Sequence, residues 1–426
     1  MVAPWVLLGL ASVTAFFTLN AFLPVRRNRI LFLPSFIASW ATIELAWWHL
    51  LWEAVAAVVL VRLGALDSWP GVVGLVVLVV NWVALAVIIA QSHATAALAE
   101  EALAELGGEA PGHEHHGPIH RERNIPYTRV GGRTIKLDVY APRSPGERRP
   151  AILQIHGGAW IVGDKREQGI PLLKYLAAQG WVCFNANYRL SPGATWPDHL
   201  VDCKSAVRWI REHADDYGVD PGFVAVTGGS AGGHLASMVA LTAGDPEYQP
   251  GFEDADTSVQ AAVPFYGVYD FTNRAGTMPP EFLSWFLEPM IMKRFIAEDP
   301  EAFHRASPLD RVHPDAPPFF VIHGDNDTLA PVEDARAFVA RLREVSRNPV
   351  CYLELHGAQH AFDLLTSIRT RRVVKAVHRF LHVIHQRHLA ARGSSPPVST
   401  PAGPLGGTAG GPAATGDTGD IERAAS

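Results

Sequence analysis

The chain has 426 residues, a formal net charge of -6 and 48% hydrophobic residues, which is enough for one large core and an additional region. The mild charge and the lack of a long lysine and arginine run exclude a nucleic-acid-binding protein, because such binding depends on attraction to phosphates. The cysteines, Cys183, Cys203 and Cys351, are odd in number and lie at no metal-ligand spacing. We therefore expect buried free thiols in a reducing compartment, without a disulfide framework or a zinc site.

The first part of the chain is dominated by apolar side chains. Trp5 to Leu23 carries no charge and is long enough for a hydrocarbon core that needs ~20 helical residues. It lacks the positively charged segment with which a signal peptide begins. A second span is expected within Leu33 to Leu63 and a third from about Val72 to Ala90. Residues 1–92 are therefore predicted to form a transmembrane helical region with about three spans.

The arginines after the first span predict the orientation in the membrane. Arg26, Arg27 and Arg29 follow this span at once. Because short arginine-rich loops stay on the cytoplasmic side, we expect this loop inside the cell and the N-terminus outside. After an odd number of spans, the large domain is cytoplasmic. A fourth span, or a re-entrant segment within Leu33 to Leu63, would reverse this prediction.

Three ionisable residues, Glu44, His49 and Glu53, lie among the tryptophans of the second span. Such groups are costly in hydrocarbon and normally face a protein interior or a polar cavity, which makes them functional candidates. A tilted span that begins late would instead leave Glu44 near a membrane interface, with tryptophans as its anchors. We favour this second interpretation and assign no chemistry to the three residues.

Residues 93–122 are predicted to be a linker, with an exposed helix over Ala96 to Leu106 that ends at a glycine pair. A histidine-rich cluster follows this helix. It comprises His113, Glu114, His115, His116 and His120. These side chains could hold a metal, but the neighbouring glycine and proline indicate a segment in which nothing orients such ligands. A solvated linker is therefore the preferred interpretation.

From Ile125 onward, short apolar runs alternate with helical patterns. The expected strands are Tyr127 to Val130, Thr134 to Tyr140, Ala151 to Ile155, Trp181 to Ala186, Phe223 to Val226, Val259 to Phe265, Phe319 to Ile322 and Val350 to Leu355. The expected helices are Glu167 to Ala178, Pro197 to Tyr217, Ala231 to Ala243, Val332 to Val345 and Val373 to His388. This alternation predicts an α/β domain over residues 123–390, with a mostly parallel sheet and helices on both faces. Residues 391–426 are poor in large apolar groups and are predicted to be a disordered tail.

A glycine-rich turn, Gly228 to Gly233, separates a predicted strand from a predicted helix and has Ser230 at its centre. Glycines give room for a sharp reversal, which would hold the Ser230 hydroxyl above the sheet edge. The Ala231 N–H would lie at a helix N-terminus, where a developing negative charge is stabilised. Alone, the Gly-x-Ser-x-Gly pattern does not separate a nucleophile from a plain glycine-rich turn.

The strand Ala151 to Ile155 leads into a second glycine pair, within His156-Gly157-Gly158-Ala159-Trp160. Because the carboxyl ends of parallel strands meet at one edge, this pair can stand beside Ser230. The N–H groups of Gly157, Gly158 and Ala231 would then form a hole for an oxyanion. The alternative is a tight turn after a strand, but the two motifs in this order are a rarer coincidence than either alone.

Two late loops supply an acid and a base. After Phe319 to Ile322, Asp327 lies far enough into the loop to turn toward the site, whereas Asp325 directly follows a glycine and is expected to brace the turn. His360 lies in the loop between the last strand and the closing helix. The chain order Ser230, Asp327, His360 is the order that this architecture needs.

These motifs resemble those of the α/β-hydrolases, in the esterase branch with hormone-sensitive-lipase-like carboxylesterases and kynurenine-formamidase-like enzymes. The similarity extends from about Ile125 to His388. The matching motifs are His156-Gly157-Gly158-Ala159-Trp160, Gly228-Gly229-Ser230-Ala231-Gly232-Gly233, His323-Gly324-Asp325-Asn326-Asp327 and Gly357-Ala358-Gln359-His360. The resemblance implies a triad of Ser230, Asp327 and His360 with a backbone oxyanion hole. Two positions depart from the lipase-like pattern: Ala159 replaces a third glycine, and Gly229 replaces the usual aspartate before the serine.

An insertion over residues 271–305 contains no predicted strand and is rich in phenylalanine, methionine and tryptophan. We expect it to cap an acyl pocket, with packing between helices as the alternative. Taken together, the sequence predicts a membrane-anchored serine hydrolase that cleaves carboxylic esters, which is an esterase or lipase. We expect it to need no metal or organic cofactor. Its expected partners are a small-molecule or lipid ester and a membrane, and the oligomeric state is left open. The alternatives are an amidase, formamidase or peptidase on the same scaffold, and a catalytically silent membrane-bound binding protein.

Overall fold

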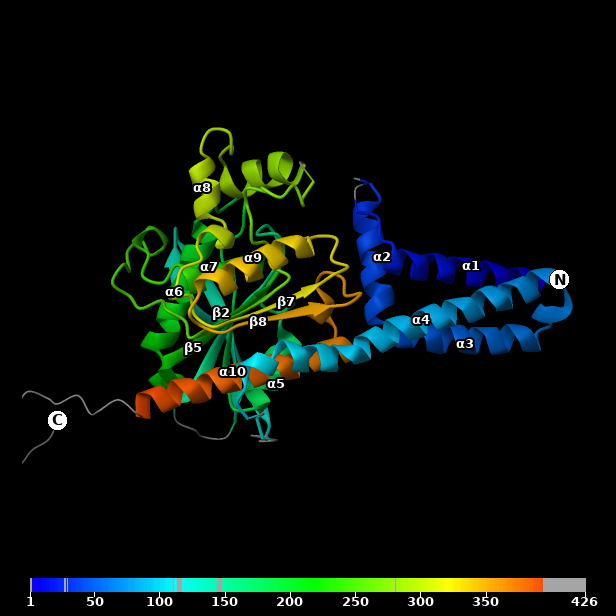
Figure 1. Ribbon diagram of the computed structural model, residues 1–426, viewed down its shortest axis with the longest axis horizontal. Helices are drawn as coiled ribbons and strands as arrows, with labels where there is room; N and C mark the ends of the chain where they lie inside the picture. Colours follow the sequence, from blue (N-terminus) through cyan, green and yellow to red (C-terminus); the bar gives the residue numbers. More distant parts are fainter. Residues whose placement is uncertain are drawn as a thin grey trace, which may run out of the picture.

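The computed structural model describes residues 2–26, 28, 30–109, 111–112, 117–143, 148–279 and 281–393. Arg27, Arg29, most of the histidine-rich cluster (residues 113–116) and most of the predicted tail (from residue 394) lie outside these ranges. The chain forms a bundle of long N-terminal helices and an α/β domain, which lie end to end (Figure 1).

Eight strands form one sheet in the order β1-β2-β4-β3-β5-β6-β7-β8. Their bounds are β1 Ile119–Val130, β2 Arg133–Pro142, β3 Arg149–Ile155, β4 Val182–Ala186, β5 Val219–Gly229, β6 Ala261–Phe265, β7 Phe319–Gly324 and β8 Val350–Leu355. Strands β3 to β8 are parallel, whereas β1 and β2 form the predicted hairpin and pair antiparallel. The prediction of a mostly parallel sheet is therefore confirmed.

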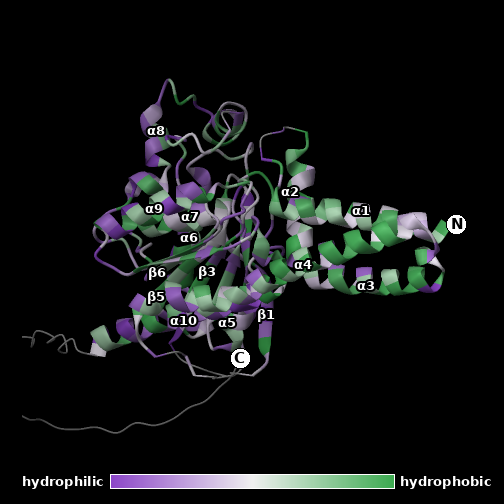
Figure 2. Ribbon diagram, turned by 45° about the vertical axis from the view of Figure 1, so that its right-hand side comes forward, coloured by the Kyte–Doolittle hydropathy of each residue, from purple (hydrophilic) through white to green (hydrophobic). Residues whose placement is uncertain are grey.

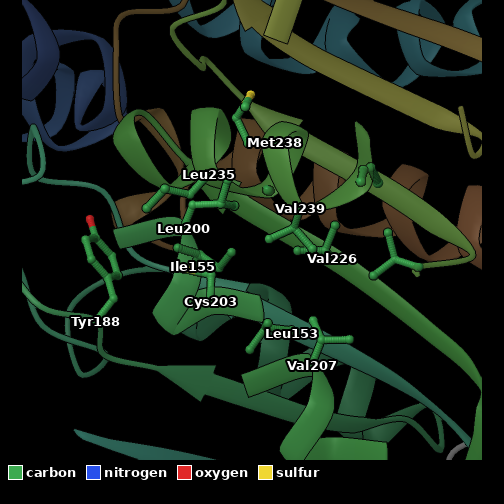
Figure 3. Packing of buried hydrophobic residues seen from close by; sticks show 14 of the residues in the cluster. Leu153, Ile155, Tyr188, Leu200, Cys203, Val207, Val226, Leu235, Met238 and Val239 are labelled. Atoms are coloured by element: carbon green, nitrogen blue, oxygen red, sulfur yellow. The ribbon is translucent and has the colours of Figure 1, made fainter. Parts of the chain in front are cut away.

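Alternation along the strands divides the core between the two faces of the sheet. Leu153 and Ile155 of β3 and Val226 of β5 belong to the cluster on the side of α6 (Asp198–Glu212) and α7 (Ala231–Leu241), shown in Figure 3. Ile152, next to Leu153 in β3, belongs to the second cluster. That cluster also holds residues of α5 (Ile170–Ala178) and α10 (Ile368–Gly393), while α9 (Val332–Val345) contributes to the first. Helices therefore cover both faces, as the sequence predicts.

The N-terminal helices are α1 (Val2–Phe22), α2 (Phe32–Glu44), α3 (Ala46–Arg62) and α4 (Trp69–Ala102). Helices α1, α3 and α4 lie side by side, with apolar residues over most of their length (Figures 1 and 2). Among the described residues, two helices are long and apolar enough to cross a membrane, or up to three if α2 and α3 count as one span. Within Leu33 to Leu63, where the sequence predicts a second span, the chain forms two helices, α2 and α3, that are bent by 81° at Leu45.

Glu44, Glu53 and Asn81 of the bundle are enclosed by protein. Asn81 of α4 donates to Glu53 of α3 at 2.9 Å and approaches the Thr14 hydroxyl of α1 at 3.5 Å. Glu44, which we expected near a membrane interface with tryptophans as its anchors, is buried within the protein. Its carboxylate is 3.5 Å from the guanidinium of Arg369 in α10, and both side chains are almost fully buried. Glu44 and Glu53 thus join helices to one another.

The predicted linker is largely part of the folded structure. The expected exposed helix over Ala96 to Leu106 is the continuation of α4 and of the short turn after it. Ala99, Leu103 and Leu106 are buried in the same cluster as residues of α10. Strand β1 also begins within the predicted linker. The sequence missed this docking because the alanine and glutamate composition of an exposed helix also suits a helix with one buried side.

Arg369 connects the helical bundle to the α/β domain. Beside Glu44 of α2, it donates to the carbonyl of His356 after β8 at 2.9 Å and approaches the Ser92 hydroxyl of α4 at 3.5 Å. An isolated buried charge is strongly unfavourable, so the pair is stable only while both partners are present.

Arg369→Ala should destabilise the protein by about 3–5 kcal/mol, because it leaves the Glu44 carboxylate buried without its cation. The measurement is the apparent melting temperature of the full chain in detergent. Arg372→Ala, on an exposed position of the same helix, is the control and should change stability by less than about 0.5 kcal/mol. The double change Glu44→Gln with Arg369→Met should recover part of the loss. Equal melting temperatures for the two alanine variants would contradict this role of the pair.

Candidate active site

Ser230 occupies a sharp turn between β5 and α7. Its backbone, with φ 60° and ψ -122°, adopts a conformation that residues with side chains rarely take. The turn is held because the Ser230 N–H donates to the carbonyl of Phe265 at 3.0 Å and the Ser230 carbonyl accepts from the His234 N–H at 3.0 Å. The residue is half-buried, and its hydroxyl has no hydrogen-bond partner among the described residues. The hydroxyl is therefore presented at the sheet edge, as the motif predicts.

The glycines around this turn allow backbones to touch. A Cβ on Gly232 would lie 2.1 Å from the carbonyl oxygen of Ile155, and one on Gly228 would lie 2.4 Å from that of Gly232. No side chain fits at such distances. The start of α7 therefore packs directly on the end of β3, which brings the loop after β3 to Ser230.

That loop, His156 to Trp160, lies against the serine. A Cβ on Gly157 would come within 3.0 Å of the Ser230 Cβ. Gly158, Ala159 and Trp160 follow with φ of 111°, 52° and 60°, three successive residues in a conformation that favours glycine. The predicted meeting of the two glycine motifs at one edge is thus seen in the structure.

The backbone amides of this region are not equivalent. The Gly157 N–H, expected to be free, donates to the side-chain oxygen of Gln168 at 2.6 Å. Among the described residues, the N–H groups of Gly158 and Ala231 have no acceptor. Gly158 and Ala231 are therefore the available donors, and Gly157 would become available only if Gln168 moved. Gln168 could not be predicted as this acceptor, because a single glutamine before a helix has no distinctive pattern.

Asp327 and His360 form a buried hydrogen-bonded pair. The Nδ1 atom of His360 lies 2.7 Å from Oδ2 of Asp327, while Oδ1 accepts from the N–H groups of Leu329 and Ala330 at 2.8 Å each. Burial by itself raises the pKa of Asp327, but the charges and hydrogen bonds of His360 and His323 outweigh it and hold this pKa below its usual range. The carboxylate is therefore ionised and aimed at the imidazole.

Asp325 lies elsewhere in the same loop. It accepts from the Gly357 N–H at 2.7 Å and lies 3.0 Å from Nδ1 of His356. It thus connects the loops after β7 and β8 without touching His360. The sequence argument that Asp325 braces the turn and Asp327 faces the histidine agrees with these contacts.

Tyr266 links the serine turn to the histidine. Its ring lies 4.6 Å from the imidazole of His360, and a Cβ on Gly229 would come within 2.7 Å of the Tyr266 oxygen. Among the described residues, no hydrogen bond joins Ser230 to His360. Such bonds are often long without substrate and tighten only in the reacting complex. The structure therefore gathers the three side chains at one edge of the sheet. Among the described residues, the contact between Asp327 and His360 is formed, and the one between Ser230 and His360 is not.

Another serine and histidine, Ser191 and His199, do form a hydrogen bond, at 3.0 Å. Both are buried, and Ser191 also donates to the Ala194 carbonyl. The second ring nitrogen of His199 has no partner among the described residues. Burial lowers the pKa of His199 to about 4. This pair has neither an orienting carboxylate nor access, so it serves as a structural contact.

Helix α2 and the chain before it reach the loops of Asp327 and His360, which the sequence did not indicate. The ring of Phe36 lies 6.4 Å from that of His360, and the Trp40 Nε1–H donates to the Ala361 carbonyl at 3.0 Å. The Arg26 guanidinium donates to the Asp327 carbonyl at 2.9 Å. No local pattern could reveal these contacts, since they join residues about 300 positions apart.

The insertion over residues 271–305 forms a helix over Phe282–Met292 and helix α8 (Pro300–Arg305), with no strand among its described residues. Leu287, Ile291 and Met292 are buried in the main core. Trp285 is 63% exposed and Phe295 54% exposed. The segment thus packs on the core and also presents apolar side chains outward. Among the described residues, no group of three or more His, Cys, Asp or Glu side chains could hold a metal ion.

Several known proteins are similar to part of this chain. The family BD-FAE matches residues 137–342. Esterase LipQ of Mycobacterium tuberculosis is 48% identical over 280 residues, which cover 65% of this chain and 66% of LipQ. The probable carboxylic ester hydrolase LipM of the same organism is 50% identical over 274 residues, 63% of each chain. This chain therefore spans slightly less than two thirds of the length of these relatives.

A solved structure is also similar. The butyrate-bound esterase Est2 of Thermogutta terrifontis superposes with a TM-score of 0.52 at 27% identity, and the match covers 65% of this chain and 95% of that chain. With the strand order and the sharp serine turn, this similarity shows that the domain has the α/β-hydrolase fold.

Proposed function

We propose that this protein is a carboxylic ester hydrolase in which Ser230 is the nucleophile, His360 the base and Asp327 the orienting acid. The observation that carries the proposal is the buried bond between Asp327 and His360, beside a strained turn that presents the Ser230 hydroxyl. Similarity to LipQ and LipM supports the same chemistry. The insertion at 271–305 is proposed as the cap over the acyl group, because it carries exposed apolar side chains.

The proposed reaction begins when Nε2 of His360 takes the proton from the Ser230 hydroxyl. The serine oxygen then attacks the ester carbonyl carbon, and the oxyanion accepts hydrogen bonds from the Gly158 and Ala231 N–H groups. His360 passes its proton to the leaving alcohol. Water, activated by the same nitrogen, releases the acyl group as a carboxylic acid. The ionised Asp327 fixes the proton on Nδ1 and stabilises the imidazolium.

Ser230→Ala should lower kcat for p-nitrophenyl butyrate on the order of 10⁶-fold, the loss typical of a removed serine nucleophile. A fluorophosphonate should label the unchanged protein at Ser230 and leave this variant unlabelled. Ser191→Ala, in the other serine and histidine pair, is the control and should retain labelling. A protein that folds but takes no adduct on Ser230 would instead be a catalytically silent binding protein.

Asp327→Asn should lower kcat about 10⁴-fold, because the imidazole would be held in the wrong tautomer. Asp325→Asn, in the same loop but bonded to Gly357 and His356, should cost less than about tenfold. Steady-state kinetics with one soluble ester measures both. If Asp325→Asn lowered kcat much more than Asp327→Asn, the orienting acid would be reassigned to Asp325.

The proposal includes anchoring of the bundle in a membrane, with α1, α3 and α4 as three crossing helices. Helix α3 has 17 residues, about 26 Å at 1.5 Å per residue, which is close to a hydrocarbon core of ~30 Å. Arg26 lies at the end of the bundle next to the α/β domain, and two further arginines, Arg27 and Arg29, lie within three positions of it in the sequence. Because arginines favour the cytoplasmic side, the domain is proposed to be cytoplasmic.

A cysteine at Asp67, between α3 and α4, should react with a membrane-impermeant maleimide in intact cells. A cysteine at Glu298, exposed in the α/β domain, should react only after lysis. The three native cysteines are buried, so background labelling should be low. The opposite pattern would reverse the orientation, and equal labelling of both sites would contradict a crossing bundle.

A further inference from the structure

Helix α2 lies across the end of the bundle that meets the α/β domain (Figure 1). It is bent by 81° from α3. If α1, α3 and α4 cross a membrane, a helix at this angle runs nearly parallel to the membrane surface. Helix α2 would then separate the bilayer from the edge of the sheet that carries the proposed catalytic residues.

One side of α2 contacts the loop of the proposed base. Phe36 lies against the ring of His360, and the Ser39 hydroxyl is 3.4 Å from the side-chain nitrogen of Gln359. Trp40, one turn after Phe36, donates to the carbonyl of the residue that follows His360. These contacts recur three and four residues apart, which is the spacing of one helix face. Helix α2 is thus a wall of the site.

Apolar side chains lie uncovered on the rest of α2. Leu33 and Ile37, one turn apart, are 55% and 52% exposed, and Ile30 and Leu31 just before the helix are 82% and 52% exposed. Phe22 at the end of α1 and Leu23 just after it are also exposed. Such a surface is unfavourable in water but suits the boundary between lipid headgroups and acyl chains, where interfacial helices lie.

We propose that α2 is an interfacial helix that forms the membrane-side wall of the active site, and that the substrate is a long-chain ester dissolved in the bilayer. This inference rests on the proposed ester hydrolase function. An amphiphilic ester holds its polar carbonyl group near the headgroups and its acyl chain among the lipid tails. If the sheet edge with the proposed catalytic residues lies at the depth of the headgroups, the ester carbonyl can reach it while the acyl chain stays among the lipid tails. Moving the acyl chain into water would cost about 0.8 kcal/mol for each CH₂ group.

The test compares two esters with the full chain reconstituted in phosphatidylcholine vesicles. p-Nitrophenyl butyrate represents a water-soluble ester, and p-nitrophenyl palmitate, incorporated in the vesicles, represents a bilayer-dissolved one. The variant Leu33→Ser with Ile37→Ser makes the lipid-facing side polar without touching the catalytic loops. Its kcat/KM for the palmitate should fall at least tenfold, while that for the butyrate should stay within twofold. Leu389→Ser, an exposed apolar residue on the distal part of α10, should change neither.

The position of α2 in the membrane is measured separately with single cysteine variants. Poor folding of the Leu33 and Ile37 double variant then cannot account for the outcome. A bimane fluorophore on Ile37→Cys should be quenched by lipids with a nitroxide near the headgroup end of the acyl chain. The same fluorophore on Leu389→Cys should not be quenched. Absence of quenching at position 37 would overturn the inference, and so would an equal loss of both activities in the Leu33 and Ile37 variant.

The two proposals fail in different ways. A protein that cleaves the butyrate and labels at Ser230 but ignores the palmitate in vesicles overturns only the inference about the substrate. A protein that cleaves neither ester and takes no label at Ser230 overturns the hydrolase proposal, and the inference with it.

Discussion

The buried carboxylate of Asp327 is the point on which both parts of the molecule converge. Its side chain bonds to His360 and to two backbone N–H groups, while its own carbonyl accepts from Arg26 at the end of the helical bundle. Burying an ionised carboxylate is costly unless charges and hydrogen bonds replace the lost water. Here they do, since the pKa of Asp327 lies below its usual range despite complete burial. The loop must therefore hold this one conformation, and the position of His360 follows from it.

Much of the α/β domain could be predicted because its signals are local. Apolar runs such as Ala151 to Ile155 and Phe319 to Ile322 match β3 and β7, and the glycine turn around Ser230 is where the motif places it. The different contacts of Asp325 and Asp327 were also within reach, because distance along the loop from the preceding glycine decides which side chain can turn away from the strand and meet His360. In each case the physical cause lies within a few residues.

Other features depend on partners far away in the chain and could not be predicted. The burial of Glu44 could not be predicted, because its partner Arg369 lies more than 300 positions later in the chain. The Gly157 N–H was expected to be free, and only the structure shows that the side-chain oxygen of Gln168 accepts from it. The helix over Ala96 to Leu106 has a composition that suits solvent, and only its position along α10 shows that one side is buried.

The continuity of α4 gives these long-range contacts a mechanical consequence. Its 34 residues, about 51 Å of helix, run from the far end of the bundle to the surface formed by α10 without a break. A flexible linker would let the α/β domain turn freely, but a continuous helix transmits the orientation of the bundle. Arg369 adds a second attachment, because it contacts α2, α4 and the loop after β8 together. The edge of the sheet that carries Ser230, Asp327 and His360 thus has a fixed direction relative to the bundle, and a membrane around the bundle would fix its height as well.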